Sequence, residues 1–151
     1  MLDNGATFPP FSLSDQDGNI HSNESLCGRH AVIYFYPKDD TPGCTAEACE
    51  LNERMERFAN VPIFGVSPDS VKSHKEFAEK FGLDFPLLAD TDHALAEACG
   101  LWIEKSMYGK KYWGVDRATF VLDADGKVLR AFPKVKPQGH AEEILAALGT
   151  L

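Results

Sequence analysis

Residues 31–49, AVIYFYPKDDTPGCTAEAC, join an expected strand to an expected helix and place a cysteine at their junction. The first six residues are apolar, β-branched or aromatic, and such a run predicts a strand buried on both faces. Pro37 ends the run, and a polar turn leads to Cys44 at the expected start of a helix. There, unpaired backbone N–H groups and the positive end of the helix dipole favour a thiolate over a thiol. Because Cys49 follows five residues later, the stretch predicts thiol redox chemistry.

On either side of this stretch, turn signals and hydrophobic spacing predict alternating strands and helices. We expect a hairpin within 8–22, a strand 31–36, a helix 44–59, a strand 61–66, a helix ending at 81, a strand 87–89, a brief helix ending at 98, a hairpin of strands 118–122 and 128–132, and a last helix after 139. Residues 103–114 are expected to form an exposed loop. The strand–helix–strand unit requires parallel neighbours, whereas the late hairpin adds antiparallel strands. The expected fold class is α/β, with a mixed central sheet flanked by helices.

Composition predicts one globular domain covering residues 1–151, because 44% of the residues are hydrophobic and 25% are charged. A net charge of −8 without a cluster of Lys or Arg argues against nucleic-acid binding. The N-terminus has no signal-peptide pattern, and no apolar run reaches the roughly 20 residues that span a bilayer. We therefore expect a cytoplasmic protein that binds no membrane.

The four cysteines do not predict a disulfide-stapled scaffold or a zinc site. A secreted disulfide scaffold is shorter and denser in cysteine. The only close pair, C-x4-C, lacks a second Cys or His pair at the spacing of structural zinc sites, so we expect no bound metal.

Pro37, Thr41 and Cys44 follow the order P-x-x-x-T-x-x-C, which resembles the peroxidatic-cysteine motif of the peroxiredoxins. The continuation to Cys49 is similar to the bacterioferritin-comigratory-protein (BCP)/PrxQ branch, in which a resolving cysteine lies five residues on. Residues 11–18 and 114–123 extend the resemblance over nearly the whole chain. It implies a thioredoxin-like fold with an N-terminal β-hairpin extension, and the activity of a thiol-dependent peroxidase.

The resemblance also implies roles for three residues around Cys44, the expected peroxidatic nucleophile. Arg117, in the segment R-x-T-F, would hold its guanidinium beside the thiolate and bind the peroxide oxygens, although an arginine at a strand start is more often a solvated surface residue. The Thr41 hydroxyl would reach thiolate and peroxide, but an ordinary turn or cap threonine fits the same position. Pro37 would end the strand and shield the thiolate from water. Glu47 is expected only to stabilise the start of the helix, without a catalytic role.

Cys49 would resolve the sulfenic acid on Cys44 by forming a disulfide, as the resemblance implies. A five-residue step along an ideal helix separates the Cα atoms by about 8.6 Å, beyond the roughly 7 Å that a disulfide spans. The start of the helix must therefore unwind before the two sulfurs bond. Cys49 as a small core residue and Cys99 as the resolving residue stay open as alternatives. Cys27 has no motif around it and is expected to be inert.

The implied cycle reduces hydrogen peroxide or an alkyl hydroperoxide, forms the Cys44–Cys49 disulfide, and closes when a thioredoxin-like dithiol reduces that bond. It needs no haem, flavin or metal, and the resemblance favours a monomer. A general dithiol–disulfide oxidoreductase on the same fold is one alternative, but that class favours C-x-x-C at the helix start. A redox sensor that passes oxidation to a partner is another, because its chemistry at Cys44 would be the same.

Overall fold

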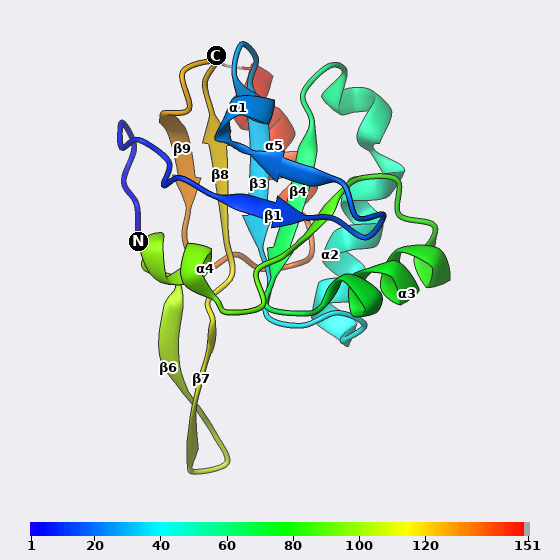
Figure 1. The fold of residues 1–151 in the computed structure, drawn as a ribbon, viewed down its shortest axis with the longest axis vertical. Helices are drawn as coiled ribbons and strands as arrows, with labels where there is room; N and C mark the ends of the chain where they lie inside the picture. Colours follow the sequence, from blue (N-terminus) through cyan, green and yellow to red (C-terminus); the bar gives the residue numbers. More distant parts are fainter. Residues whose placement is uncertain (150–151) are drawn as a thin grey trace.

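A mixed five-stranded sheet forms the centre of the computed structural model, which describes residues 1–149 (Figure 1). Its order is β5-β4-β3-β8-β9, with the strands β3 (Ala31–Phe35), β4 (Ile63–Ser67), β5 (Leu87–Ala89), β8 (Ala118–Leu122) and β9 (Val128–Phe132). β3, β4 and β5 are parallel, whereas β8 is antiparallel to both β3 and β9. The predicted mixed α/β sheet is confirmed.

The described residues form α1 (Asn23–Leu26), α2 (Pro42–Glu53), α3 (Val71–Phe81), α4 (Ala94–Ala98), α5 (His140–Gly149) and one 3₁₀ helix, η1 (Met55–Phe58). α2 lies between β3 and β4 in the chain, α3 between β4 and β5, and α4 follows β5. The predicted end of α3 and the predicted strand β5 agree with the structure. Within residues 1–149, no helix combines the length and the apolar character that crossing a membrane requires.

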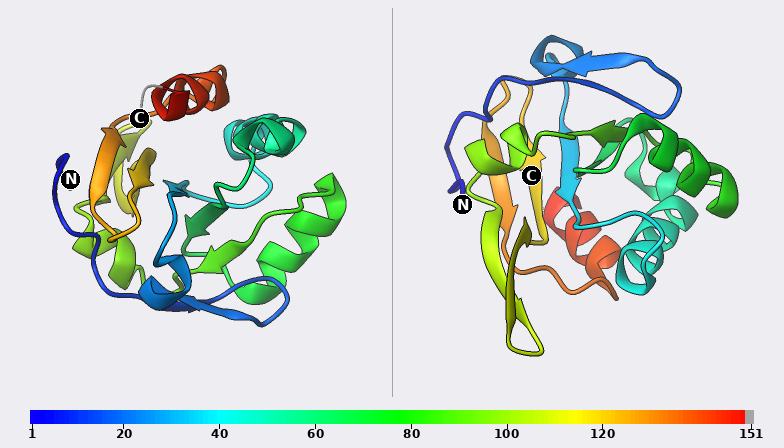
Figure 2. Two further views of the ribbon diagram at one scale, coloured as in Figure 1. Left: turned by 90° about the horizontal axis from the view of Figure 1, so that it is seen from above. Right: turned by 60° about the horizontal axis from the view of Figure 1, so that its bottom comes forward.

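The two faces of the sheet are covered by different parts of the chain (Figure 2). α2 and α5 pack on the face that carries Val32 and Tyr34. α4 and the segment around Phe8 pack on the opposite face, with Ile33. α3 lies at the β5 edge and contributes Phe77 to the same core as α2. Because both faces are covered, all five residues of β3 are buried and the strand shows no polar alternation.

The predicted N-terminal hairpin is present as β1 (Ser12–Ser14) and β2 (Ile20–Ser22), which pair in antiparallel fashion. Gly18 adopts a positive φ of 81° in the connecting turn, a conformation that glycine reaches without steric cost. The four-residue α1 that follows was not predicted, because a single helical turn leaves no hydrophobic period in the sequence.

The prediction of an exposed loop at 103–114 was wrong. These residues belong to a second hairpin, β6 (Trp102–Met107) and β7 (Lys110–Val115), which projects from the body of the molecule (Figure 1). Tyr108 and Gly109 connect the strands with φ values of 52° and 78°, as a two-residue turn of type I′ requires. The hairpin escaped detection because its side chains are mostly exposed, so the alternation that marks a half-buried strand is missing.

The single helix predicted from 44 to 59 is two elements, α2 and η1. α2 begins two residues earlier than predicted because Thr41 occupies the N-cap position and Pro42 the first helical position. Proline is suited to that position, where its missing N–H would have no partner within the helix. Cys44 is consequently the third residue of α2, inside its first turn.

Candidate active site

The register of the sheet brings the start of α2 beside the start of β8. Phe35, the last residue of β3, lies opposite Ala118, the first residue of β8. Since the two strands are antiparallel, the carboxyl end of β3, from which the chain continues to α2, lies beside the amino end of β8, which Arg117 precedes. Cys44 and Arg117, which are 73 positions apart in the chain, therefore meet where these two strand ends lie side by side.

Cys44, Arg117 and Glu47 form a polar cluster against the core under α2. Arg117 Nη2 donates to Cys44 Sγ at 3.1 Å, and Arg117 Nη1 donates to Glu47 Oε1 at 3.2 Å. Cys44 is 1% exposed and Glu47 is 2% exposed, whereas the Arg117 side chain keeps 19% of its surface accessible. The guanidinium and the N-terminus of α2 both direct positive charge towards the sulfur. The remaining N–H groups of Arg117 are hydrogen-bond donors that suit an oxygen atom of a ligand.

Glu47 takes a larger part in this cluster than the helix-start role predicted from the sequence. The three-residue spacing from Cys44 was the available signal, because residues three apart share one face of a helix. Burial raises the pKa of Glu47 to about 7, although the charge and the hydrogen bond of Arg117 oppose that rise. Its second oxygen, Oε2, is buried without a hydrogen-bond partner in the described part of the chain. Glu47 and Cys44 thus share one guanidinium, each bonded to a different nitrogen.

Glu47→Gln is expected to flatten the dependence of fold stability on pH. The pKa of Glu47 is about 7 in the folded protein against an ordinary value of 4.5, so the folded state binds more protons between these values. The free energy of unfolding therefore falls as pH rises through this window, by up to about 1.4 kcal/mol per pH unit. Glutamine keeps an acceptor for Arg117 and has no proton to lose. Denaturant titrations across the window measure the slope.

The matched control for this prediction is Glu53→Gln, which changes a carboxylate on the same helix whose side chain is 73% exposed. It should leave the pH slope as it is in the parent protein. Equal slopes for Glu47→Gln and the parent protein would contradict the assignment of the raised pKa to Glu47.

Gly43 makes room for the guanidinium over the first turn of α2. A Cβ on this residue would lie 2.8 Å from Arg117 Nη2 and 3.4 Å from Pro137 Cγ. A cavity of about 410 Å³ opens at the same place, with Pro42, Ala46 and Pro137 among its lining residues. Lys136 and Gln138 complete the lining, so the cavity beside Gly43 is bounded by apolar and polar side chains.

Pro37 and Thr41 lie in the loop between β3 and α2, as predicted, but the Thr41 hydroxyl is not hydrogen-bonded to Cys44 among residues 1–149. Pro37 is half-buried just beyond the end of β3. The Thr41 hydroxyl donates to the Lys38 carbonyl at 2.8 Å. In this state Thr41 therefore has the role of a turn and cap residue, because its hydroxyl donates to the backbone of the same loop.

Cys49 lies on α2 and is half-buried. Both Cys44 and Cys49 carry free thiols, and the unbroken helix between them keeps them apart. Burial, together with the charge of Glu53, raises the pKa of the Cys49 thiol. Cys49 therefore carries a free thiol whose ionisation its surroundings disfavour.

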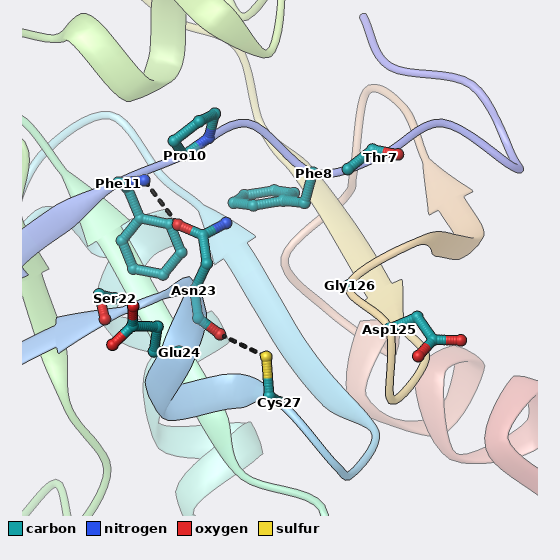
Figure 3. Close-up of a pocket in the computed structure, with 10 residues that line it drawn as sticks. All are labelled: Thr7, Phe8, Pro10, Phe11, Ser22, Asn23, Glu24, Cys27, Asp125 and Gly126. Carbon is teal, nitrogen blue, oxygen red and sulfur yellow. Dashed lines mark hydrogen bonds between the residues drawn. The ribbon is translucent and has the colours of Figure 1, made fainter.

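The other two cysteines lie away from this cluster. Cys99 is buried in the core on the opposite face of the sheet, where burial and the charge of Asp90 raise its pKa to about 12. Cys27 lines a cavity of about 570 Å³ together with Phe8 and Phe11, and its thiol donates to the Asn23 carbonyl at 3.4 Å (Figure 3). The geometry thus separates both residues from Cys44.

One group of three side chains in the described chain has donor atoms close enough to hold a metal ion. Atoms of Asp39, Asp69 and His74 lie within 4.8 Å of one another. Each of these atoms is already hydrogen-bonded, to another member of the group, to a hydroxyl or to the backbone. The group is therefore a hydrogen-bond network rather than an open ligand set.

Topology and site together define the class: a thioredoxin-like protein with a buried cysteine, Cys44, in the first turn of α2. Residues 4–131 match the model of the AhpC/TSA family. Peroxiredoxin Bcp of Xanthomonas campestris is 49% identical over 146 residues, which are 95% of this chain and 90% of that protein. Peroxiredoxin Bcp of Escherichia coli is 43% identical over 143 residues, covering 93% and 92% of the two chains.

Solved structures agree with these sequence matches. The bacterioferritin comigratory protein of Xanthomonas campestris, from work on its alkyl peroxide reduction activity, matches with a TM-score of 0.89 and 45% identity, over 99% of this chain and 97% of that one. A cysteine-to-serine mutant of PrxQ from Xylella fastidiosa matches with a TM-score of 0.91 and 36% identity, over 99% and 97%. The chain belongs to the AhpC/TSA family and, within it, to the BCP/PrxQ peroxiredoxins.

Proposed function

We propose that the protein is a thiol-dependent peroxidase in which Cys44 is the peroxidatic nucleophile. The observation that carries this proposal is the 3.1 Å contact between Arg117 Nη2 and Cys44 Sγ at the first turn of α2. A guanidinium in this place favours the thiolate and offers donors to the peroxide oxygens, where negative charge develops as the O–O bond breaks. The peroxiredoxin names of the relatives, and the alkyl peroxide reduction studied in one of them, support the same activity.

In the first step, the Cys44 thiolate attacks one peroxide oxygen and the O–O bond breaks. The sulfur is oxidised to a sulfenic acid, and the leaving oxygen takes a proton and departs as water or as an alcohol. Arg117 stabilises the departing negative charge, and Pro37 shields the sulfur from solvent. Thr41 joins the site when its hydroxyl exchanges the Lys38 carbonyl for a peroxide oxygen. The apolar part of the cavity beside Gly43 supports alkyl hydroperoxides, besides hydrogen peroxide, as substrates.

In the second step, the Cys49 sulfur attacks the sulfenic sulfur of Cys44, an S–S bond forms, and water leaves. The first turns of α2 must unwind for this step, since an intact helix holds the two Cα atoms about 8.6 Å apart. Cys49 is favoured over Cys99 because it shares α2 with Cys44, whereas Cys99 is buried across the sheet. A thioredoxin-like dithiol then reduces the disulfide by exchange and returns both thiols. No haem, flavin or metal takes part in this cycle.

The wider setting is proposed on sequence grounds. We infer a cytoplasmic monomer, folded as one domain over residues 1–151, that binds neither nucleic acid nor membrane. The acidic charge without a basic cluster and the use of free thiols support this setting.

Product mapping after a single oxidation tests the proposed function. Reduced protein is treated with one equivalent of hydrogen peroxide, quenched with a thiol-blocking reagent and analysed by mass spectrometry. We expect a Cys44–Cys49 disulfide that disappears when either cysteine is replaced by serine. A lasting sulfenic acid on Cys44, or a bond to Cys99, would retain the peroxidase but overturn the resolving step. An unmodified Cys44 would overturn the proposal as a whole.

A further inference from the structure

A buried hydrogen-bond network holds the loop that leads from β3 to α2. Its centre is Asp39, five residues before Cys44 in the sequence. Asp39 Oδ1 accepts from the Tyr36 hydroxyl at 2.6 Å. Asp39 Oδ2 accepts from the Ser73 hydroxyl at 2.8 Å and lies 2.7 Å from His74 Nδ1. The carboxylate thereby joins the loop to helix α3, which carries Ser73 and His74.

His74 continues this connection into the sheet. It is 0% exposed, and its Nε2 lies 3.0 Å from the carbonyl oxygen of Leu88 in β5. Both ring nitrogens therefore lie within hydrogen-bond distance of an oxygen atom. A buried carboxylate and a buried imidazole are tolerated together only when their polar atoms are bonded, and here they are. Removing one partner would leave the other buried and unsatisfied.

The backbone of the same loop is held as well. Asp39 N–H donates to Asp69 Oδ2 at 2.8 Å, and the same oxygen accepts from the Ser67 hydroxyl at 2.6 Å. Asp40 has a φ of 55°, a conformation that residues other than glycine rarely adopt. Such a conformation persists only where the surroundings impose it. The next residue, Thr41, is the N-cap of α2, so the loop geometry fixes where the helix begins.

The start of α2 is thus held from two sides. Arg117 holds Cys44 from β8, while the Asp39 network holds the preceding loop from α3 and β5. Disulfide formation with Cys49 has to break the contact between Cys44 and Arg117, because Cys44 changes its position when the first turns of α2 unwind. The Asp39 network contains neither cysteine and restrains the upstream end of the segment that unwinds.

We propose that Asp39 and His74 are positioning residues that set the balance between the folded form of α2, which reacts with peroxide, and the unwound form, which makes the disulfide. The proposal rests on the proposed function. A weaker network favours the unwound form. Oxidation of Cys44 by peroxide then becomes slower, condensation with Cys49 becomes faster, and less Cys44 is over-oxidised to sulfinic acid because the sulfenic acid is consumed sooner.

Hydrogen exchange on the reduced protein tests this proposal without peroxide. In Asp39→Asn we expect the amides of residues 43–49 to exchange at least about tenfold faster, the factor that corresponds to losing one charge-assisted hydrogen bond. Ser73→Ala, which removes a single bond to Asp39, should show a smaller increase, and Ser73→Thr, which keeps a hydroxyl, should restore the parent rate. Ser73→Ala also decides the matter where Asp39→Asn fails to fold.

Two variants control for general loss of stability. Lys80→Ala removes the exposed ion pair of 2.9 Å to Asp40 in the same loop, outside the buried network. Asp90→Asn alters a different buried carboxylate, which accepts from the Leu95 and Ala96 N–H groups of α4. Neither should change exchange at 43–49 relative to the rest of the chain. A change confined to the network variants supports the proposal, whereas equal exchange at 43–49 in Ser73→Ala, Ser73→Thr and the parent protein overturns it.

A second readout is the ratio of Cys44–Cys49 disulfide to Cys44 sulfinic acid after a fixed excess of hydrogen peroxide. The ratio should rise in the network variants and stay at the parent value in both controls. A falling ratio would overturn the proposed direction. A parent protein that does not consume peroxide would overturn the proposed function, while the exchange rates would still decide whether the network holds the start of α2.

Discussion

Replacing Arg117 by alanine should slow the oxidation of Cys44 by peroxide by a factor on the order of 100 to 1,000, the usual cost of removing a donor from a site of developing negative charge. Arg117 Nη2 lies 3.1 Å from the sulfur, so the variant loses both the charge that favours the thiolate and a donor to the peroxide. It also leaves the buried Glu47 without its cation. Stopped-flow kinetics measure the rate of Cys44 oxidation, and the ultraviolet absorbance of the thiolate measures the ionisation of Cys44 separately.

Arg117→Lys is the informative companion to this variant. Lysine keeps the charge but cannot reach Cys44 and Glu47 at the same time with the planar fork of a guanidinium. We expect the thiolate absorbance to be largely retained and the rate to stay well below that of the parent protein. Arg117→Ala with an unchanged rate and an unchanged thiolate absorbance would remove Arg117 from the mechanism.

Cys49→Ser should abolish sustained turnover with a dithiol reductant while leaving the first reduction of peroxide close to the parent rate. Cys49 is half-buried on α2 and is absent from the contacts among Cys44, Arg117 and Glu47. The variant therefore retains all the groups that act in the reduction of peroxide, but no neighbouring thiol condenses with the sulfenic acid. Cys44 then accumulates as sulfenic acid and, with further peroxide, as sulfinic acid. Burst kinetics and mass spectrometry measure the two consequences.

Cys99→Ser and Cys27→Ser are the matched controls for Cys49. Cys99 is buried on the far side of the sheet, and Cys27 lies beside another cavity, so neither change should affect turnover. Sustained turnover in Cys49→Ser that disappears only when Cys99 is also replaced would transfer the resolving role to Cys99.

Much of the architecture could be predicted because the local signals were strong. The strand 31–36 was predicted from a continuous apolar run, and the structure places β3 at Ala31–Phe35 with every residue buried. α3 has a serine cap, Ser70, whose side chain accepts from Ser73 N–H, and a left-handed glycine at its end, Gly82. Such caps are local chemistry and therefore visible in sequence.

The projecting hairpin of β6 and β7 was not predicted, because its local sequence signals are weak. Lys110–Val115 is mostly exposed, so burial imposes no alternation on the residues of this strand. Its turn, Tyr108-Gly109, lacks the Asn-Gly or Asp-Gly pair by which such turns are usually recognised. Where side chains do not contribute to a core, the sequence pattern carries little information on pairing.

The sequence by itself determined where the two neighbouring cysteines lie: Cys44 follows a buried strand and a turn, at a helix start, and Cys49 follows on the same helix. These features depend on neighbours within a few residues. The family resemblance implied that Arg117 lies beside the sulfur, and the tertiary structure shows the contact and adds Glu47 to it. The antiparallel pairing of β3 with β8 places Arg117 beside Cys44. Burial raises the pKa of Glu47, at the start of the same helix, to about 7. The same folding closes the Asp39–His74 contact. Contacts and burial of this kind depend on how separate elements pack, and residue spacing along the chain does not encode that packing directly.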